Sequence, residues 1–188
     1  MLFRSYQINC AREGWPILIA AATYKSDTGR GPFDIPYDQF GVAQGLATGS
    51  GFQAIEPTLS FLLPSDPAVI FGSLGYIHSF GRDIDKDIGG AHVGDVDPGD
   101  TIVAAAGFGF AINPRFSFSL GYRHNYLFPT YTYLNDTKQR SPVLQVGAFT
   151  FGWSYALTSR IAFASSAEFG VTSDAPGLNL IFRVPIRF

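Results

Sequence analysis

The chain has 188 residues and a formal net charge of −2, with 46% hydrophobic, 15% aromatic and 15% charged residues. This length is typical of a single domain, here residues 1–188, and the weak charge excludes the strongly basic surface that nucleic-acid binding requires. A single cysteine, Cys10, excludes a disulfide framework. No run of residues approaches the ~18–20 apolar positions that a membrane-spanning helix needs.

Alternation of large and small residues divides the chain into nine predicted strands. It is clearest in 116–128, where Phe, Leu, Tyr and His occupy the even positions and mostly Ser, Gly, Arg and Asn the odd ones. This period of two is typical of β-strands. Pro57 and Pro185 fall within two of the segments and predict a bulge or a locally unpaired stretch. The predicted strands span 2–9, 16–25, 51–62, 68–80, 101–112, 116–128, 142–156, 160–171 and 177–188.

The two faces of these strands differ in a way that indicates a membrane barrel. In a soluble sandwich, the face opposite the apolar one is rich in Lys, Glu and Thr because it meets water. Here that face carries mostly Gly, Ala and Ser with an occasional Arg or Glu. Large residues toward lipid and small or polar ones toward the interior are typical of outer-membrane barrels. We therefore expect an all-β, antiparallel transmembrane β-barrel of the bacterial outer-membrane type, surrounded by outer-membrane lipid, with a soluble β-sandwich as the alternative.

The connections between the predicted strands alternate between short and long. The long ones, about 26–50, 81–100 and 129–141, together with the modest 172–176, hold eleven of the fifteen acidic residues. Short periplasmic turns and longer extracellular loops are the expected asymmetry of outer-membrane barrels. We therefore expect the long connections to be extracellular.

If the long connections are extracellular, the direction of every predicted strand is fixed, and so is the side of the membrane on which each end of the chain lies. The last strand would end in the periplasm at Phe188, and counting back nine strands places Met1 at the extracellular rim. Bacterial single-chain barrels have even strand numbers with both termini in the periplasm. Residues 1–10 also lack the apolar run of a signal peptide. The expectation is an N-terminally truncated larger barrel of about twelve strands; the alternative is a closed eight-stranded barrel in which 2–9 is not a strand.

Several turn-and-strand segments resemble one outer-membrane family. They are Gly29-Arg30-Gly31-Pro32-Phe33-Asp34, Phe71-Gly72-Ser73-Leu74-Gly75-Tyr76, Asp97-Pro98-Gly99-Asp100, the run from Ala111 through Asn113-Pro114-Arg115 to Tyr122, and the stretch from Asp174-Ala175-Pro176 to Phe188. Over residues 15–188 the chain is similar to the C-terminal two-thirds of the meta-pathway-of-phenol-degradation or "putative transporter" group. The resemblance implies a channel-type barrel for hydrophobic or aromatic compounds. It also implies that the last strand, ending in Phe188, is an insertion signal for the barrel assembly machinery.

The charged residues on the small-residue face are the candidate functional set. By alternation, the inward-facing charges are Glu56, Arg123, Glu168, Arg183 and Arg187. Charges inside a barrel are costly unless they are paired or hydrated. One interpretation is a selectivity-setting ladder of the kind found in pores. The other is a structural Arg–Glu network that holds the wall together.

Other constellations carry weaker signals. Asp83, Asp85 and Asp87 alternate in a way that could converge on a cation, but Ile88 and Gly94 stand where an EF-hand needs Gly and Glu. We therefore expect a solvated loop and no metal site. Of the three histidines, His124 is predicted on the lipid face, two strands from Ser165, so no nucleophile–base pair is expected. The sequence predicts neither an enzyme nor a cofactor.

The sequence therefore predicts an outer-membrane channel or transporter-like barrel for small solutes, among them hydrophobic or aromatic compounds. Two alternatives remain open. One is a structural or interaction barrel that acts through its acidic extracellular loops. The other is a protein-secretion pore, which the resemblance includes because a related barrel type secretes amyloid subunits.

Overall fold

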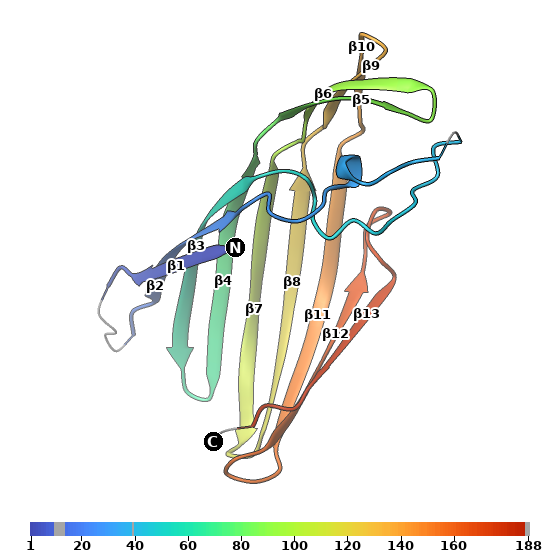
Figure 1. The fold of residues 1–188 in the computed structure, drawn as a ribbon. Coiled ribbons are helices and arrows are strands. Elements are labelled where there is room, and N and C mark those ends of the chain that lie inside the picture. The colour runs from blue at the N-terminus through green and yellow to red at the C-terminus, as the bar shows by residue number, and fades with distance from the viewer. Residues whose placement is uncertain (10–13, 39, 187–188) are drawn as a thin grey trace.

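The structure is a computed structural model that describes residues 1–9, 14–38 and 40–186 (Figure 1). It contains two antiparallel sheets, which we call the wall sheet and the rim sheet. The wall sheet has nine strands in the order β1-β2-β3-β4-β7-β8-β11-β12-β13. These strands are β1 (Leu2–Gln7), β2 (Ile17–Lys25), β3 (Ala54–Ser65), β4 (Ala68–Ser79), β7 (Thr101–Asn113), β8 (Phe116–Leu127), β11 (Leu144–Ala156), β12 (Ala162–Gly170) and β13 (Leu178–Arg183).

The all-β class and the nine predicted strands are confirmed, and each wall strand lies within a few residues of its predicted bounds. The prolines mark the irregular places. Pairing between β3 and β4 passes from Ile55↔His78 to Thr58↔Gly75 without a partner for Pro57. The last strand ends at Arg183, before Pro185. A proline cannot donate to the ladder, and both interruptions follow from that.

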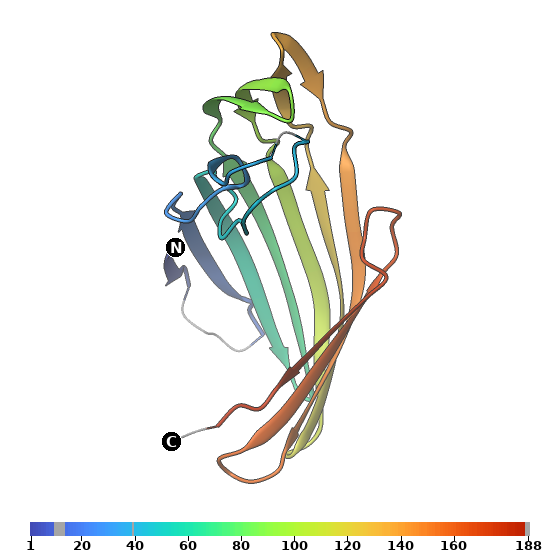
Figure 2. The same cartoon turned by 45° about the vertical axis from the view of Figure 1, so that its right-hand side comes forward.

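The wall sheet is tall and curled, with β13 sweeping across its lower end (Figure 2). Within the described residues, β1 pairs only with β2 and β13 only with β12, so the sheet is open between its two edges. Because nine strands alternate in direction, β1 and β13 run the same way. No helix among the described residues is long and apolar enough to cross a membrane.

The rim sheet is built from segments that the sequence presented as loops. Its order is β10-β9-β6-β5, and it lies beyond the upper end of the wall sheet (Figure 1). Within it, β6 pairs with β9 through Val93↔Leu134 and Asp97↔Tyr131. The predicted connections 81–100 and 129–141 therefore each contain a hairpin. The rim strands are β5 (Arg82–Ile88), β6 (Ala91–Asp97), β9 (Tyr131–Leu134) and β10 (Thr137–Arg140).

The rim sheet holds the chain's small hydrophobic core. The buried side chains of Ile84, Val93 and Val96 form its centre. The first long connection, which includes a 3-10 helix at Pro32–Asp34, packs against that centre through Phe33 and Phe52. Those two rings meet edge to face with centroids 6.1 Å apart. Three segments far apart in sequence thus fold into one unit above the wall.

The wall sheet separates two chemically different faces. On its outer face, as we call it, large side chains stand in the open: Leu74 is 59% exposed, Phe149 56% and Phe182 63%. On the opposite face, which we call the inner face, the register aligns small residues, as in the row Ser60–Ser73–Ala105. Among the described residues of the wall strands, Ala148 is the one buried hydrophobic residue. The wall therefore has no conventional core of its own.

Candidate functional site on the inner face of the wall sheet

The inner face is assembled from alternate residues of every wall strand. Successive residues of a strand point to opposite sides, so one register fixes the face of every residue that pairs with it. The row that contains Arg123 runs from Ala105 on β7 through Arg123 on β8 to Ala148 on β11 and Gly170 on β12. Gly107, Gly121, Thr150, Glu168 and Asn179 form the neighbouring row.

The register places four of the predicted inward-facing charges on this one face: Glu56, Arg123, Glu168 and Arg183. Arg187 and Phe188 lie outside the described residues, so the structure places neither the fifth charge nor the predicted insertion signal. That the inner face lines a lumen stays a prediction. Of these four residues, Arg123 and Glu168 form an ion pair. Glu56 on β3 and Arg183 on β13 lie apart from that pair.

Arg123 and Glu168 form a small network with Asn179. The Arg123 Nη2 donates to Glu168 Oε2 at 3.4 Å, and Asn179 Nδ2 donates to the same oxygen at 3.3 Å. The arginine side chain is 45% exposed and the glutamate 21%. An Arg–carboxylate pair neutralises both charges locally. The Arg123–Glu168 pair therefore carries little net charge, and both the selectivity and the structural-network interpretations of it stay predictions.

Glu56 occupies a separate place near the upper end of β3. Together with Thr23, Lys25, Ser50 and Phe52 it lines a cavity of about 300 Å³ beneath the first long connection. The glutamate does not lie within 4 Å of any described basic nitrogen. Its carboxylate lies over the backbone of Gly75, with Oε1 3.4 Å from the position of a Cβ built there. Glycine at position 75 thus leaves room for the acid.

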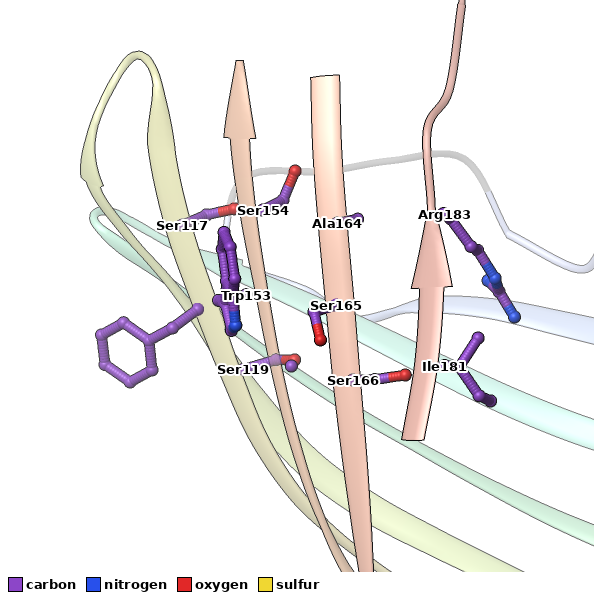
Figure 3. A pocket seen from close by; sticks show the side chains of 12 residues that line it. Ser117, Ser119, Trp153, Ser154, Ala164, Ser165, Ser166, Ile181 and Arg183 are labelled. Carbon is purple, nitrogen blue, oxygen red and sulfur yellow. The ribbon is translucent and has the colours of Figure 1, made fainter. Parts of the chain in front are cut away.

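A groove lined by serines of β8, β11 and β12 ends at Arg183 on the edge strand β13, at the lower end of the inner face (Figure 3). Its volume is about 310 Å³. Two neighbouring rows of the register build it: Ser117–Ser154–Ala164–Arg183 and Ser119–Gly152–Ser166–Ile181. Gly152 keeps it open, because a Cβ there would lie 2.7 Å from Ser119 Oγ. Sequence reasoning named Arg183 but missed the serines, whose signal was only their alternate spacing in each strand.

The rim contains an ion cluster that alternation did not reveal. Arg82 on β5 donates to Asp34 through both amino groups, at 2.8 and 3.3 Å, and to Asp27 at 3.1 Å. Hydrogen bonds from Arg82, then the backbone N–H of Gly31 and the charge of Arg82, lower the pKa of Asp34 from 3.8 to about 2 against a smaller opposing effect of burial. The same contacts raise the pKa of Arg82. This cluster fastens the first long connection to the rim sheet.

The weak cation candidates lie on the β5–β6 hairpin. His92 reaches Asp85 with Nε2 at 3.5 Å and Asp87 with Nδ1 at 3.0 Å, so these carboxylates meet an imidazole. Asp83 faces Asp95 across the hairpin. Over the described residues, no three His, Cys, Asp or Glu side chains are arranged to hold a metal ion.

The remaining sequence candidates lie apart from one another. His124 Nδ1 and the hydroxyl of Tyr122 are 3.0 Å apart on the outer face of β8. Ser165 lies on β12, with β11 between the two strands. No protein-family model matches the sequence. The geometry of the two faces, the charge pair and the serine–arginine groove is therefore what supports a function.

Proposed function

We propose that the wall sheet forms part of a β-barrel in the bacterial outer membrane, with its outer face against lipid and its inner face along a conduit for small solutes. One observation carries this proposal: an apolar band extends over the outer face of the wall strands. Its exposed members include Leu59, Leu74, Phe108, Leu120, Phe149, Phe151, Phe169, Leu180 and Phe182.

Water is a poor environment for such a surface. Fully burying one large apolar side chain is worth about 1.5–3 kcal/mol relative to leaving it exposed. Soluble monomers rarely show contiguous apolar patches larger than a few hundred Å². A soluble sandwich would cover this face with a second sheet, but the described rim sheet packs on Phe33 and Phe52 instead. Hydrocarbon chains of a bilayer are the covering that fits the band.

Aromatic residues at the two ends of the band support the same orientation. Tyr76 and Tyr126 lie in one outer row near the rim, joined through Ile102. Trp153 and Tyr155 lie near the opposite end of β11, where Trp153 stacks obliquely with Phe163 at 5.3 Å between centroids. Tyr and Trp side chains favour the headgroup level because one end of each is apolar and the other polar. The rows between them suit the hydrocarbon layer.

Closing this wall into a barrel sets a condition on strand number. Since β1 and β13 run in the same direction, an antiparallel closure needs an odd number of further strands between them. We propose such a closure for the assembled protein. It removes both sheet edges, as a membrane requires, because unpaired backbone groups cannot be hydrated in hydrocarbon.

The proposal is tested with the protein extracted from outer-membrane vesicles and reconstituted in planar bilayers and liposomes. We expect discrete conductance steps and entry of small neutral solutes into liposomes. A protein that inserts, shown by heat-modifiable migration and strand-rich circular dichroism, yet passes neither ions nor solutes would rule out the conduit.

A second function, an interaction barrel, is favoured by the order within the rim. A packed core and the Arg82 cluster make it a preformed surface rather than a set of solvated loops. Removing residues 26–50 and 81–100 separates the two functions. A conduit keeps or increases its solute flux after the deletion, whereas an interaction barrel, which passes no solute before or after the deletion, loses its partner.

A further inference from the structure

The groove around Arg183 is lined by hydrogen-bond donors whose own partners are missing from the described residues. The hydroxyls of Ser117, Ser119, Ser154 and Ser166 make no hydrogen bond there, and Arg183 makes no ion pair. A guanidinium carries five N–H donors and no acceptor, and each hydroxyl adds one more donor. Together with Arg183, which is exposed, these water-accessible groups offer several donors to a ligand rich in acceptors.

The described lining also lacks an opposing charge. Among the described residues that line the groove there is no acidic side chain; besides Arg183 they are serine, glycine, alanine and isoleucine, with Phe118 and Trp153 of the outer face at its border. This differs from Arg123, whose charge Glu168 neutralises at 3.4 Å, and from the upper cavity, where Glu56 and Lys25 share one wall. On the described inner face, Arg123 is paired with an acid and Lys25 lines a cavity that also contains Glu56, whereas the groove beside Arg183 contains no described acid.

Size and position restrict the ligand further. The groove volume of about 310 Å³ is at the low end of the range for ligand pockets. Gly152 and Ala164 keep its floor shallow, so the ligand stays in contact with the water of the conduit. Guanidinium groups bind planar anionic oxygen groups through paired hydrogen bonds.

We infer that the serine–arginine groove binds the anionic oxygen group, carboxylate or phosphate, of small anions as they pass along the inner face. This inference rests on the proposed conduit and names its substrate class. Arg183 supplies charge and paired donors, and the serines on the neighbouring strands supply further hydrogen bonds. The groove then acts as a low-affinity, water-accessible binding site, which raises the local concentration of anions and still releases them.

Planar-bilayer measurements on the full chain test this inference. Reversal potentials under gradients of potassium chloride, potassium acetate and potassium phosphate give the permeability of each anion relative to potassium. The wild type is compared with Arg183→Gln, with Arg183→Lys, and with the double variant Ser117→Ala, Ser154→Ala. Arg160→Gln is the matched control, because it removes the same charge from an exposed turn at the same end of the wall.

We expect the wild type to favour anions and Arg183→Gln to lower the relative permeability of acetate about threefold to tenfold, with little change in Arg160→Gln. Arg183→Lys should keep the preference for chloride but lose part of that for acetate. If Arg183→Gln lowers the relative permeability of phosphate more than that of acetate, phosphate is the preferred group. If it lowers that of acetate more, carboxylate is the preferred group.

Conductance with the same anion preference in wild type and Arg183→Gln would overturn the anion site and leave the conduit standing. Inserted protein without conductance in every variant would overturn the conduit and the inference with it. If Arg183→Gln does not assemble, the double serine variant decides, because it keeps the charge and removes only hydroxyls. An acetate preference unchanged in that variant would then contradict the groove.

Discussion

The rim sheet buries its apolar side chains within the protein, whereas the wall sheet leaves its large apolar side chains exposed on one face. The rim places Ile84, Val93 and Val96 at 4–6% exposure under Phe33 and Phe52. The wall has more strands, yet its large side chains, such as Leu74 and Phe149, are more than half exposed. The rim is thus built as a small water-soluble domain is built, whereas the wall leaves its large apolar side chains exposed on one face, and we propose that lipid covers them.

Electrostatics follow the same division. In the rim, Arg82 and Asp34 form a two-pronged contact close to a packed core, and the pKa of Asp34 falls to about 2. On the inner face of the wall, Arg123 and Glu168 meet at 3.4 Å with the arginine half-exposed. Charges fasten the first long connection to the rim, whereas the Arg123–Glu168 pair of the wall joins two strands of one sheet and is partly exposed.

The largest expected effect comes from a charge on the outer face. Leu74→Arg should lower the free energy of unfolding from liposomes by about 2–4 kcal/mol, because an arginine at mid-depth on a lipid-facing strand is poorly solvated. Denaturant titration of the liposome-inserted protein, followed by tryptophan fluorescence, measures the loss.

Ser73→Arg is the matched control, since Ser73 precedes Leu74 and lies on the inner face beside Ser60 and Ala105. We expect a change of about 1 kcal/mol or less for this variant. Equal losses at the two positions would remove the distinction between the faces.

The next effect is confined to the rim. Ile84→Ala should cost about 2 kcal/mol locally, because it leaves a cavity in a small core. Hydrogen exchange followed by mass spectrometry should show faster exchange in 82–97 and unchanged protection in β8. Val42→Ala, at a residue that is 57% exposed, should leave both regions unchanged. Equal loss of protection in β8 would show that wall and rim do not unfold independently.

Acid should loosen the rim through Asp34. Its pKa is lower in the folded protein than the ordinary 3.8, so its contribution to stability is present above pH 3.8 and is lost as the pH falls towards 2. Partial exposure limits that contribution to about 1 kcal/mol. Asp34→Asn should therefore speed exchange in 26–38 relative to wild type at neutral pH, and the difference should shrink as the pH falls through the folded-state pKa of about 2.

Asp136→Asn serves as the comparison for acid sensitivity, because Asn tolerates the positive φ of 62° at that turn position. It should match the wild type at every pH. A difference between Asp34→Asn and wild type that is as large at pH 2 as at neutral pH would contradict the role of the ionised carboxylate.

The smallest stability effect is expected at the wall pair. Glu168→Gln should change the free energy of unfolding by less than about 1 kcal/mol, because Arg123 is nearly half exposed to solvent and the amide oxygen still accepts from Asn179. The same variant should raise anion permeability, since Arg123 loses its neutralising partner. A destabilisation of several kcal/mol, measured in the same denaturant titration, would assign Glu168 a mainly structural role.

The wall could be predicted from sequence and the rim could not, for a physical reason. Each wall strand shows its own alternation, so 116–128 is visible without knowing its partners and occurs as β8, Phe116–Leu127. The β5–β6 hairpin is rich in Asp, a residue depleted in strands, and its pairing with β9 joins Val93 to Leu134 far along the chain. These rim strands depend on pairing with segments far away in the sequence, which no local pattern reveals.

In the candidate site, too, the residues set by a single strand could be predicted from sequence and those set by pairing between strands could not. The alternation of large and small residues within a strand suffices to place Arg123 and Glu168 on the small-residue face. Both were therefore named from sequence. The serine groove depends on the register among β8, β11, β12 and β13, which no single strand contains. The contact between Arg82 and Asp34 likewise spans 48 residues and carries no periodic signal.

Spin labels along β8 test the central claim most directly. In a Cys10→Ser background, single cysteines at Ser117, Phe118, Ser119, Leu120, Gly121 and Tyr122 carry the label in liposomes. Accessibility to oxygen, which collects in lipid, and to a water-soluble nickel chelate should alternate, with oxygen favoured at 118, 120 and 122 and the chelate at 117, 119 and 121. Chelate access at every position, or alternation of the opposite phase, would contradict an outer face that lies against lipid.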